Sequence, residues 1–231
     1  MTNVLQDWKN VKGAWLYVFI AFYLLFLSSF LFAWEPRDLF YLNEMFMIPL
    51  VVLGTVLILQ REFGGYFSEI YATFPVSMPL MMLRKILQLY VFIATIHLFW
   101  TVIYRVKFGS MKTVLYYYKT DEAVFQEVSW LNLFVQSVPA YLVITGVTLL
   151  GMVLTKKVYG GLGAGFAVWM FEVISTGGIT GEWTLFTIFI PMETAFARNR
   201  LGLLAIFIVL LLLSFWWANK REKWIVADDS N

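Results

Sequence analysis

The chain has 231 residues, of which 61% are hydrophobic and only 14% are charged, and its mean hydropathy is +0.75. A soluble domain of this length is closer to about half apolar and about a quarter charged, so the composition indicates an integral membrane protein. The net charge of +2 excludes the strongly basic surface of a protein that binds nucleic acid. The absence of cysteine excludes disulfides, thiol catalysis and cysteine-ligated metals, and with a single histidine, His97, no metal site is expected.

The length predicts one all-α membrane domain over residues 1–231, because a helix needs roughly 20 apolar residues to cross a bilayer and the chain can hold about six crossings. Before the first crossing, residues 3–13 follow a helical period with Val4, Trp8 and Val11 on one stripe. That pattern is typical of a helix lying in the headgroup plane. A helical extension of the first span fits the same residues.

The predicted spans are residues 14–33, 42–60, 86–104, 130–155, 158–177 and 201–218. The first run is uncharged and longer than the core of a usual signal peptide, and no small-x-small cleavage site precedes Trp34. The second run is short and contains Pro49 and Gly54, so residues 39–42 are expected to join it.

Two connecting segments have a predicted character. Residues 105–127 are expected to form a wet loop whose Tyr116, Tyr117 and Tyr118 suit the membrane interface. Between spans five and six, the apolar residues 183–192 are too few to cross, and Pro191 lies at their end. A segment this short is typical of a re-entrant or interfacial hairpin on one side of the membrane.

The distribution of positive charge predicts the orientation. If the spans alternate, ten of the 17 Lys and Arg residues share the side of the N-terminus, and they flank the spans directly. These ten are Lys9, Lys12, Arg61, Arg84, Lys85, Lys156, Lys157, Lys220, Arg221 and Lys223. The positive-inside rule therefore predicts a multi-pass plasma-membrane protein with both termini in the cytoplasm.

Residues 60–85 form a polar segment between spans two and three, which this topology places in the cytosol. Its C-terminal part predicts Ser77 as an N-cap, with Pro79 in the first turn of span three. The aromatic and aliphatic side chains on or beside one helical face are Tyr66, Phe67, Ile70, Tyr71 and Phe74. An exposed patch of this kind indicates a docked partner. An interfacial loop whose aromatic side chains enter the lipid fits the same residues.

The spans contain few groups that could carry chemistry. The chain has no GxxxxGK[ST] motif for ATP hydrolysis, and Gly161 and Gly165 form a GxxxG pair that favours close helix packing. Glu172 and His97 are ionisable residues within predicted spans and are therefore functional candidates. Glu172 either lines a pathway or lies at the outer interface. His97 is either a neutral residue hydrogen-bonded across helices or a proton relay.

The order of motifs in residues 60–85 resembles the inner loop of ABC transporter permeases of the second exporter type. The resemblance is carried by Glu62, Gly64, Gly65, Ile70, the run Thr73-Phe74-Pro75-Val76-Ser77, and Arg84-Lys85 at the start of the next span. Six spans, both ends inside, an N-terminal interfacial helix and re-entrant helices before the last span fit the same family. The Gly64-Gly65 pair and the short second span depart from its pattern.

The resemblance implies a non-catalytic permease subunit that binds a separate cytosolic ATPase, where ATP and Mg²⁺ would bind, so that this chain needs no cofactor. Two permease subunits, identical or related, would enclose the translocation pathway. The implied coupling helix and its flanks comprise Glu62, Gly64, Gly65, Tyr66, Phe67, Glu69, Ile70, Thr73, Phe74, Pro75 and Ser77.

The residues allow several classes of cargo and two alternative functions. A composition of 22 Phe, 12 Tyr and 10 Trp suits an amphipathic cargo such as a peptide, drug or lipid, and it equally suits lipid contact. One alternative is a proton-coupled secondary transporter that uses Glu172 and His97. The other is a membrane immunity or scaffold protein that binds a peptide or lipid without moving it.

Overall fold

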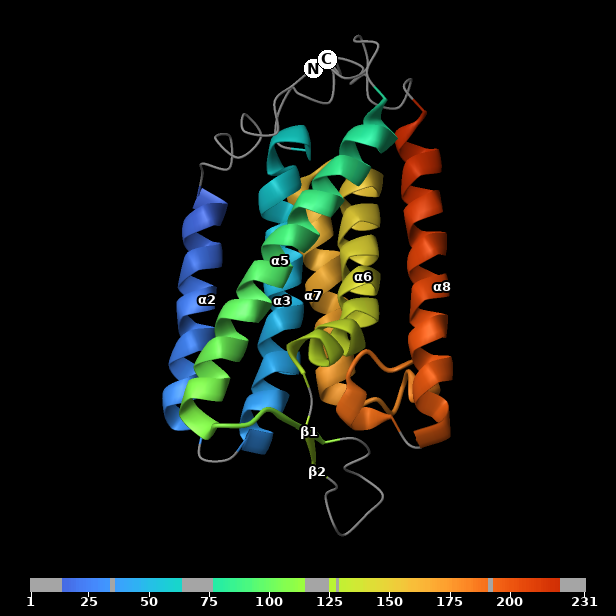
Figure 1. The fold of residues 1–231 in the computed structure, drawn as a ribbon. Helices are drawn as coiled ribbons and strands as arrows, with labels where there is room; N and C mark the ends of the chain where they lie inside the picture. The colour runs from blue at the N-terminus through green and yellow to red at the C-terminus, as the bar shows by residue number, and fades with distance from the viewer. Residues whose placement is uncertain are drawn as a thin grey trace.

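The computed structural model describes residues 14–33, 36–63, 77–114, 125–127, 129–190 and 193–220 (Figure 1). These ranges contain the helices α2 (Ala14–Phe32), α3 (Pro36–Phe63), α5 (Met78–Phe108), α6 (Trp130–Thr155), α7 (Val158–Ser175) and α8 (Glu193–Ala218). They also contain the strands β1 (Lys112–Val114) and β2 (Phe125–Glu127) and the 3₁₀ turns η1 (Gly181–Trp183) and η2 (Thr187–Phe189). The predicted helix at residues 3–13, residues 64–76 and Tyr116 to Tyr118 lie outside the described residues.

Five of the described helices are long and apolar enough to cross a bilayer: Asn43–Phe63, Met78–Phe108, Leu133–Thr155, Val158–Ser175 and Ala195–Ala218. The sixth, α2, covers the first predicted span, and the apolar part with described side chains is Leu16–Ser29. Large apolar side chains such as Leu24, Val91 and Leu212 are exposed around the bundle, where in a membrane they would meet lipid. The prediction of a helical membrane protein is thus confirmed for five spans.

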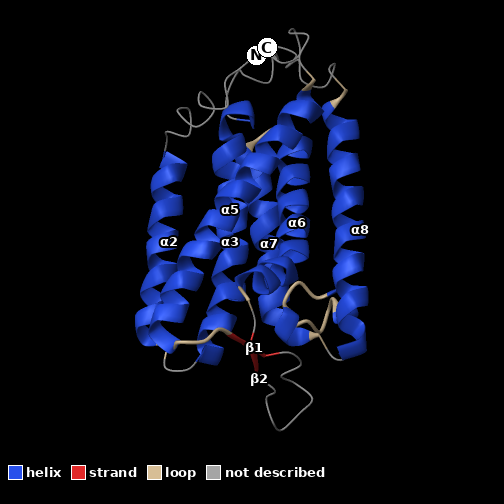
Figure 2. Ribbon diagram, in the orientation of Figure 1, coloured by secondary structure: helices blue, strands red, loops and turns tan. Residues whose placement is uncertain are grey.

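The helices run side by side and alternate in direction (Figure 1). The strands β1 and β2 lie at one end of the bundle, which we call the hairpin end (Figure 2). The other end, where α5 begins after Ser77, is called the Ser77 end. The most buried span is α3, which packs against α2, α5, α6 and α7, whereas α8 is the least buried. A displacement of α3 would therefore be felt by most of the bundle.

Three helices extend beyond the predicted spans. The helix α3 begins at Pro36 instead of residue 42, so most of the connection between the first two predicted spans is helical. Proline suits the first turn of a helix. The helix α5 covers Met78–Phe108 instead of residues 86–104, and α8 begins at Glu193 instead of residue 201. In α5 and α8 the charged residues Lys85, Arg105 and Arg200 mark the limits of the apolar runs, while the backbone remains helical past those limits.

The predicted wet loop contains regular structure at its two ends. The strands β1 and β2 pair in antiparallel register, with Lys112 opposite Glu127 and Val114 opposite Phe125. The hairpin adds a small β element to an otherwise helical chain.

Glycines bring α6 and α7 into close contact. A Cβ atom at Gly161 would lie 2.7 Å from the carbonyl oxygen of Thr148 in α6, and one at Gly165 would lie 2.5 Å from the hydroxyl oxygen of the same residue. A Cβ atom at Gly151 of α6 would lie 2.6 Å from the carbonyl oxygen of Gly160. The close packing predicted from the GxxxG pair is confirmed, since no larger residue fits at these positions.

Candidate functional site

The predicted coupling residues are only partly described. Gly64, Gly65, Tyr66, Phe67, Glu69, Ile70, Thr73, Phe74 and Pro75 lie outside the described residues. Ser77 occupies the predicted N-cap position of α5 with an extended backbone, although its side chain makes no capping hydrogen bond, and Pro79 follows in the first turn. Glu62 is in the last turn of α3.

The Glu62 carboxylate forms an ion pair with the ammonium group of Lys85 of α5, and both residues are buried, at 3% and 6% exposure. Lys85 Nζ also donates a hydrogen bond to the carbonyl oxygen of Ile58 at 2.9 Å. Burying two charges is tolerated when they are paired and hydrogen-bonded to each other. The pair therefore joins α3 to α5 directly beside the segment 64–76, and the Glu62 carboxylate is turned inward instead of toward a partner.

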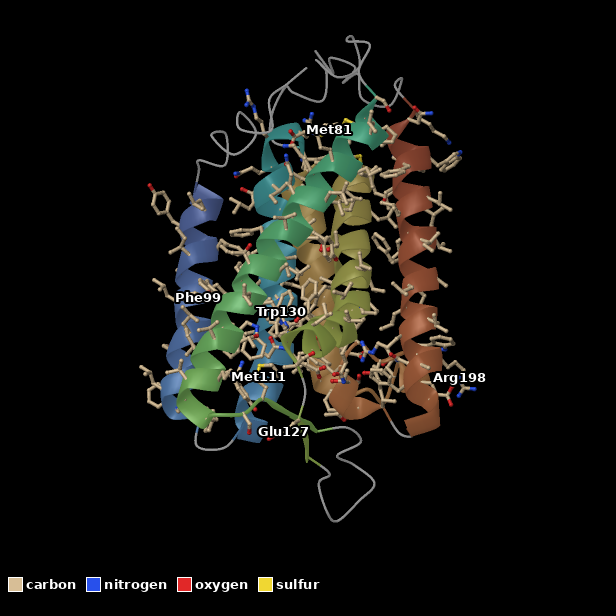
Figure 3. The ribbon with its side chains drawn as sticks, viewed as in Figure 1. Met81, Phe99, Met111, Glu127, Trp130 and Arg198 are labelled. Carbon is tan, nitrogen blue, oxygen red and sulfur yellow. The ribbon has the colours of Figure 1, made fainter. Side chains whose placement is uncertain are left out.

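A cluster rich in methionine surrounds the ends of these helices. Met78, Met81 and Met82 of α5 are buried with Met152 of α6 and with apolar residues of α3, α7 and α8. Figure 3 shows Met81 at the Ser77 end of the bundle. Thioether side chains are flexible and polarisable, so they fill gaps in more than one arrangement. This end of the core is suited to repacking when the helices move.

At the hairpin end, Glu172 lies near the end of α7 and is 1% exposed. Its Oε1 atom accepts a hydrogen bond from the backbone N–H of Leu185 at 2.7 Å, and its Oε2 atom accepts one from Thr180 Oγ1 at 2.8 Å. The choice between a pathway and the outer interface stays a prediction. Glu172 binds the loop that follows its own helix.

Glu44 of α3 binds the same loop from a second helix. Its Oε1 atom accepts hydrogen bonds from the backbone N–H of Thr187, at 3.0 Å, and from the Thr187 hydroxyl group. From α8, Asn199 Nδ2 donates to the carbonyl oxygens of Glu182 and Thr184 at 2.6 and 2.9 Å. Residues 180–187, which we call the clamped loop, are therefore tied to α3, α7 and α8.

The clamped loop overlaps the segment predicted to form a re-entrant hairpin. It connects α7 to α8 at the hairpin end and contains the 3₁₀ turns η1 and η2, so among the described residues the implied re-entrant α-helices are replaced by short turns (Figure 1). Trp183 packs directly on Gly202 of α8. Leu185 and Phe186 are buried. The segment lacks the helical length because polar contacts to Glu44, Glu172 and Asn199 satisfy its backbone instead.

His97 lies inside α5 and is fully buried. Its ring makes edge contacts with those of Trp100 at 5.0 Å, Phe134 at 5.3 Å and Trp130 at 6.4 Å between centroids. Within the described part of the chain, neither ring nitrogen has a hydrogen-bond partner. The predicted hydrogen bond across helices is therefore not present there, and the surroundings of His97 are aromatic.

Sequence reasoning missed Glu44, Asn199 and Arg200 as partners of the clamped loop. Arg200 is buried and its Nη1 atom donates to the carbonyl oxygen of Leu185 at 3.4 Å. The sequence signal was that Glu44, Asn199 and Arg200 are polar residues next to or inside apolar runs.

Both polar regions join segments that are distant in sequence. Among the residues that the structure describes, no group of three or more His, Asp or Glu side chains could hold a metal ion. No family model, no curated protein and no solved structure matches this chain.

Proposed function

We propose that the chain is the non-catalytic transmembrane subunit of an ATP-driven ABC exporter in the plasma membrane. In this proposal a separate cytosolic ATPase binds residues 64–77, which the buried Glu62 supports from the last turn of α3, and this ATPase hydrolyses ATP with Mg²⁺. Two permease subunits, identical or related, enclose the pathway for an amphipathic peptide, drug or lipid. The termini and the Ser77 end face the cytoplasm. The resemblance of residues 60–85 and the helical membrane architecture support this function.

The observation that carries the proposal is the buried pair of Glu62 and Lys85. It ties the two helices that flank residues 64–76, so a force on that segment would act on α3 and α5 together. Because α3 packs against α2, α5, α6 and α7, the force would be distributed through the bundle. In the proposal, this connection transmits a rocking motion driven by the partner to both helices.

The alternative of a proton-coupled transporter has less support. Both carboxylate oxygens of Glu172 already accept hydrogen bonds from the clamped loop, and the His97 ring is surrounded by aromatic rings. A proton relay needs polar neighbours that can pass a proton on. We therefore propose a structural role for both residues.

Copurification tests the proposed function. The tagged chain is isolated from its own membranes in mild detergent, and the eluate is assayed for a P-loop ATPase and for vanadate-sensitive ATP hydrolysis. Both should be present with the unchanged chain and lost with Glu69→Lys or Tyr66→Ala. The charge reversal Arg105→Glu, in the last turn of α5 at the hairpin end, is the matched control and should retain both. An eluate without an ATPase, or one unaffected by both changes, would contradict the proposal.

A further inference from the structure

Several buried polar atoms near the clamped loop lack a complete hydrogen bond among the described residues. Asn43 of α3 and Tyr141 of α6 are 0% and 1% exposed, and their side chains are neighbours. Among the described residues, the two amide atoms of Asn43 and the Tyr141 hydroxyl group do not reach full hydrogen-bond geometry, although the hydroxyl group lies close to both Asn43 and Ser137. The hydroxyl group of Thr184, in the clamped loop itself, is also buried and unpartnered there.

Leaving such atoms unbonded is costly, at about 1–3 kcal/mol for each group. Natural proteins satisfy buried polar groups with protein atoms or with ordered water. The Asn43 amide offers two donors and an acceptor, and each hydroxyl group offers both functions. These groups need a partner that both donates and accepts hydrogen bonds.

The surrounding charge determines the class of that partner. Glu44 and Arg200 are near enough to Tyr141 to act on it electrostatically. The charged groups of this region already bind the clamped loop: Glu44 and Glu172 accept hydrogen bonds from it, and Arg200 donates one to it. The groups left for a ligand are an amide and hydroxyl groups, so a small neutral species is favoured.

We propose that Asn43 and Tyr141 line a recess that binds water beneath the clamped loop, and that this loop controls access to the recess from the hairpin end. The contacts of the loop provide the closure. Glu172 holds the backbone N–H of Leu185, Glu44 holds that of Thr187, and Asn199 holds the carbonyl oxygen of Thr184. Water reaches Asn43 when these bonds break. This inference does not depend on an ATPase partner.

Cysteine accessibility tests the recess directly, because the natural chain contains no cysteine. The variants Asn43→Cys and Thr184→Cys are treated in sealed vesicles of either orientation with a charged methanethiosulfonate reagent, which attacks a hydrated thiolate. Ile179→Cys, on the exposed part of the α7–α8 connection, is the reactive control, and Ile144→Cys, in the apolar core, is the unreactive one. Each variant is made alone and with Glu172→Gln.

The expected result is slow labelling of Asn43→Cys and Thr184→Cys from the side that labels Ile179→Cys. Glu172→Gln weakens hydrogen bonds to a charged group, so it should speed labelling at both positions by about tenfold or more. Ile144→Cys should stay unlabelled in both backgrounds. If Asn43→Cys stays unlabelled while Thr184→Cys reacts, the loop moves but the recess is dry, and the proposal fails. Labelling of Asn43→Cys at a rate independent of Glu172→Gln would overturn the role of the loop.

A measurement on the unchanged protein guards against variants that fail to fold. Hydrogen–deuterium exchange reports on the backbone amides of Leu185 and Thr187, which the two carboxylates hold. These amides should exchange faster than those in the middle of α6. Protection as strong as that of α6 would mean that the loop does not open and would overturn the proposal.

Discussion

Lys85 extends from α5 to the last turn of α3, where its ammonium group meets the Glu62 carboxylate and the carbonyl oxygen of Ile58. The resemblance of residues 60–85 to a permease loop placed Glu62 on a surface that receives a partner. The structure turns it inward, since Lys85 supplies a buried counter-charge across the turn. At the scale of single residues, partners of this kind decide which charges remain available for docking.

Removing the Lys85 ammonium group should show how much an unpaired, buried Glu62 carboxylate lowers the free energy of unfolding. In Lys85→Met the side chain keeps its length but Glu62 loses its ammonium partner, so the free energy of unfolding should fall by about 3–5 kcal/mol. Thermal unfolding of the purified protein in detergent measures the loss. The double change Glu62→Leu with Lys85→Met should recover most of it, and a double variant as unstable as the single one would contradict a buried pair.

His97 offers a second test at this scale. A phenylalanine ring at position 97 can keep the edge contacts with Trp100, Trp130 and Phe134. It loses no hydrogen bond, because neither ring nitrogen of His97 forms one with the described residues. His97→Phe should therefore change the free energy of unfolding by less than about 1.5 kcal/mol. His97→Ala should cost about 2–5 kcal/mol because it leaves a cavity. Loss of function in a well-folded His97→Phe protein would instead support the proton relay.

Some residue-level contacts could not be predicted from the sequence. Glu44 and Thr187 are separated by 143 positions, and nothing local to either residue indicates the other. Glu172 was identified as a candidate because an ionisable residue in an apolar run is conspicuous. Its partners depend on the path of the loop after α7, which residue pattern alone does not determine.

At the scale of elements, apolar runs predicted where helices lie but not where they end. Hydropathy measures contact with lipid, and a helix can continue into water with polar residues, as α3 does from Pro36 and α8 does from Glu193. The hairpin of β1 and β2 was not predicted because its strands have only three residues each. Close packing of α7 was predicted, since small residues at a spacing of four mark a close helix approach, but the residue pattern did not identify α6 as its neighbour.

Adding a single methyl group should destabilise the protein on the packed face of α7 but not on its exposed face. Gly161→Ala places a Cβ atom against Thr148 and Met152, so it should destabilise the protein by about 1–3 kcal/mol. Gly163→Ala is the matched control, because nothing lies within 4 Å of its Cβ position and alanine favours helix. Thermal unfolding should give a lower midpoint for the first variant and an equal or higher midpoint for the second. Equal midpoints for both would contradict the observed contact.

At the scale of the whole molecule, the two ends of the bundle differ. The Ser77 end carries the buried ion pair and the methionine cluster, and the turn between α6 and α7 there includes Lys156 and Lys157. The hairpin end carries the clamped loop. The positive-inside rule predicts that the Ser77 end is cytoplasmic.

Single cysteines test this orientation in intact cells. Ile179→Cys should react with an impermeant maleimide added outside, whereas Lys157→Cys, in the turn between α6 and α7, should react only after the cells are permeabilised. Both residues are exposed, so accessibility depends on sidedness and not on burial. The reverse pattern of labelling would place residues 64–76 outside the cell, beyond the reach of a cytosolic ATPase.

The most direct test of the proposed function is a photo-crosslink from the coupling segment in native membranes. With p-benzoylphenylalanine in place of Tyr66, ultraviolet light should produce an adduct between this chain and a protein with a P-loop. The same label in place of Lys112, at the hairpin end, should not. An adduct with lipid alone from position 66, or an ATPase captured equally from both positions, would contradict the claim that residues 64–77 bind the ATPase.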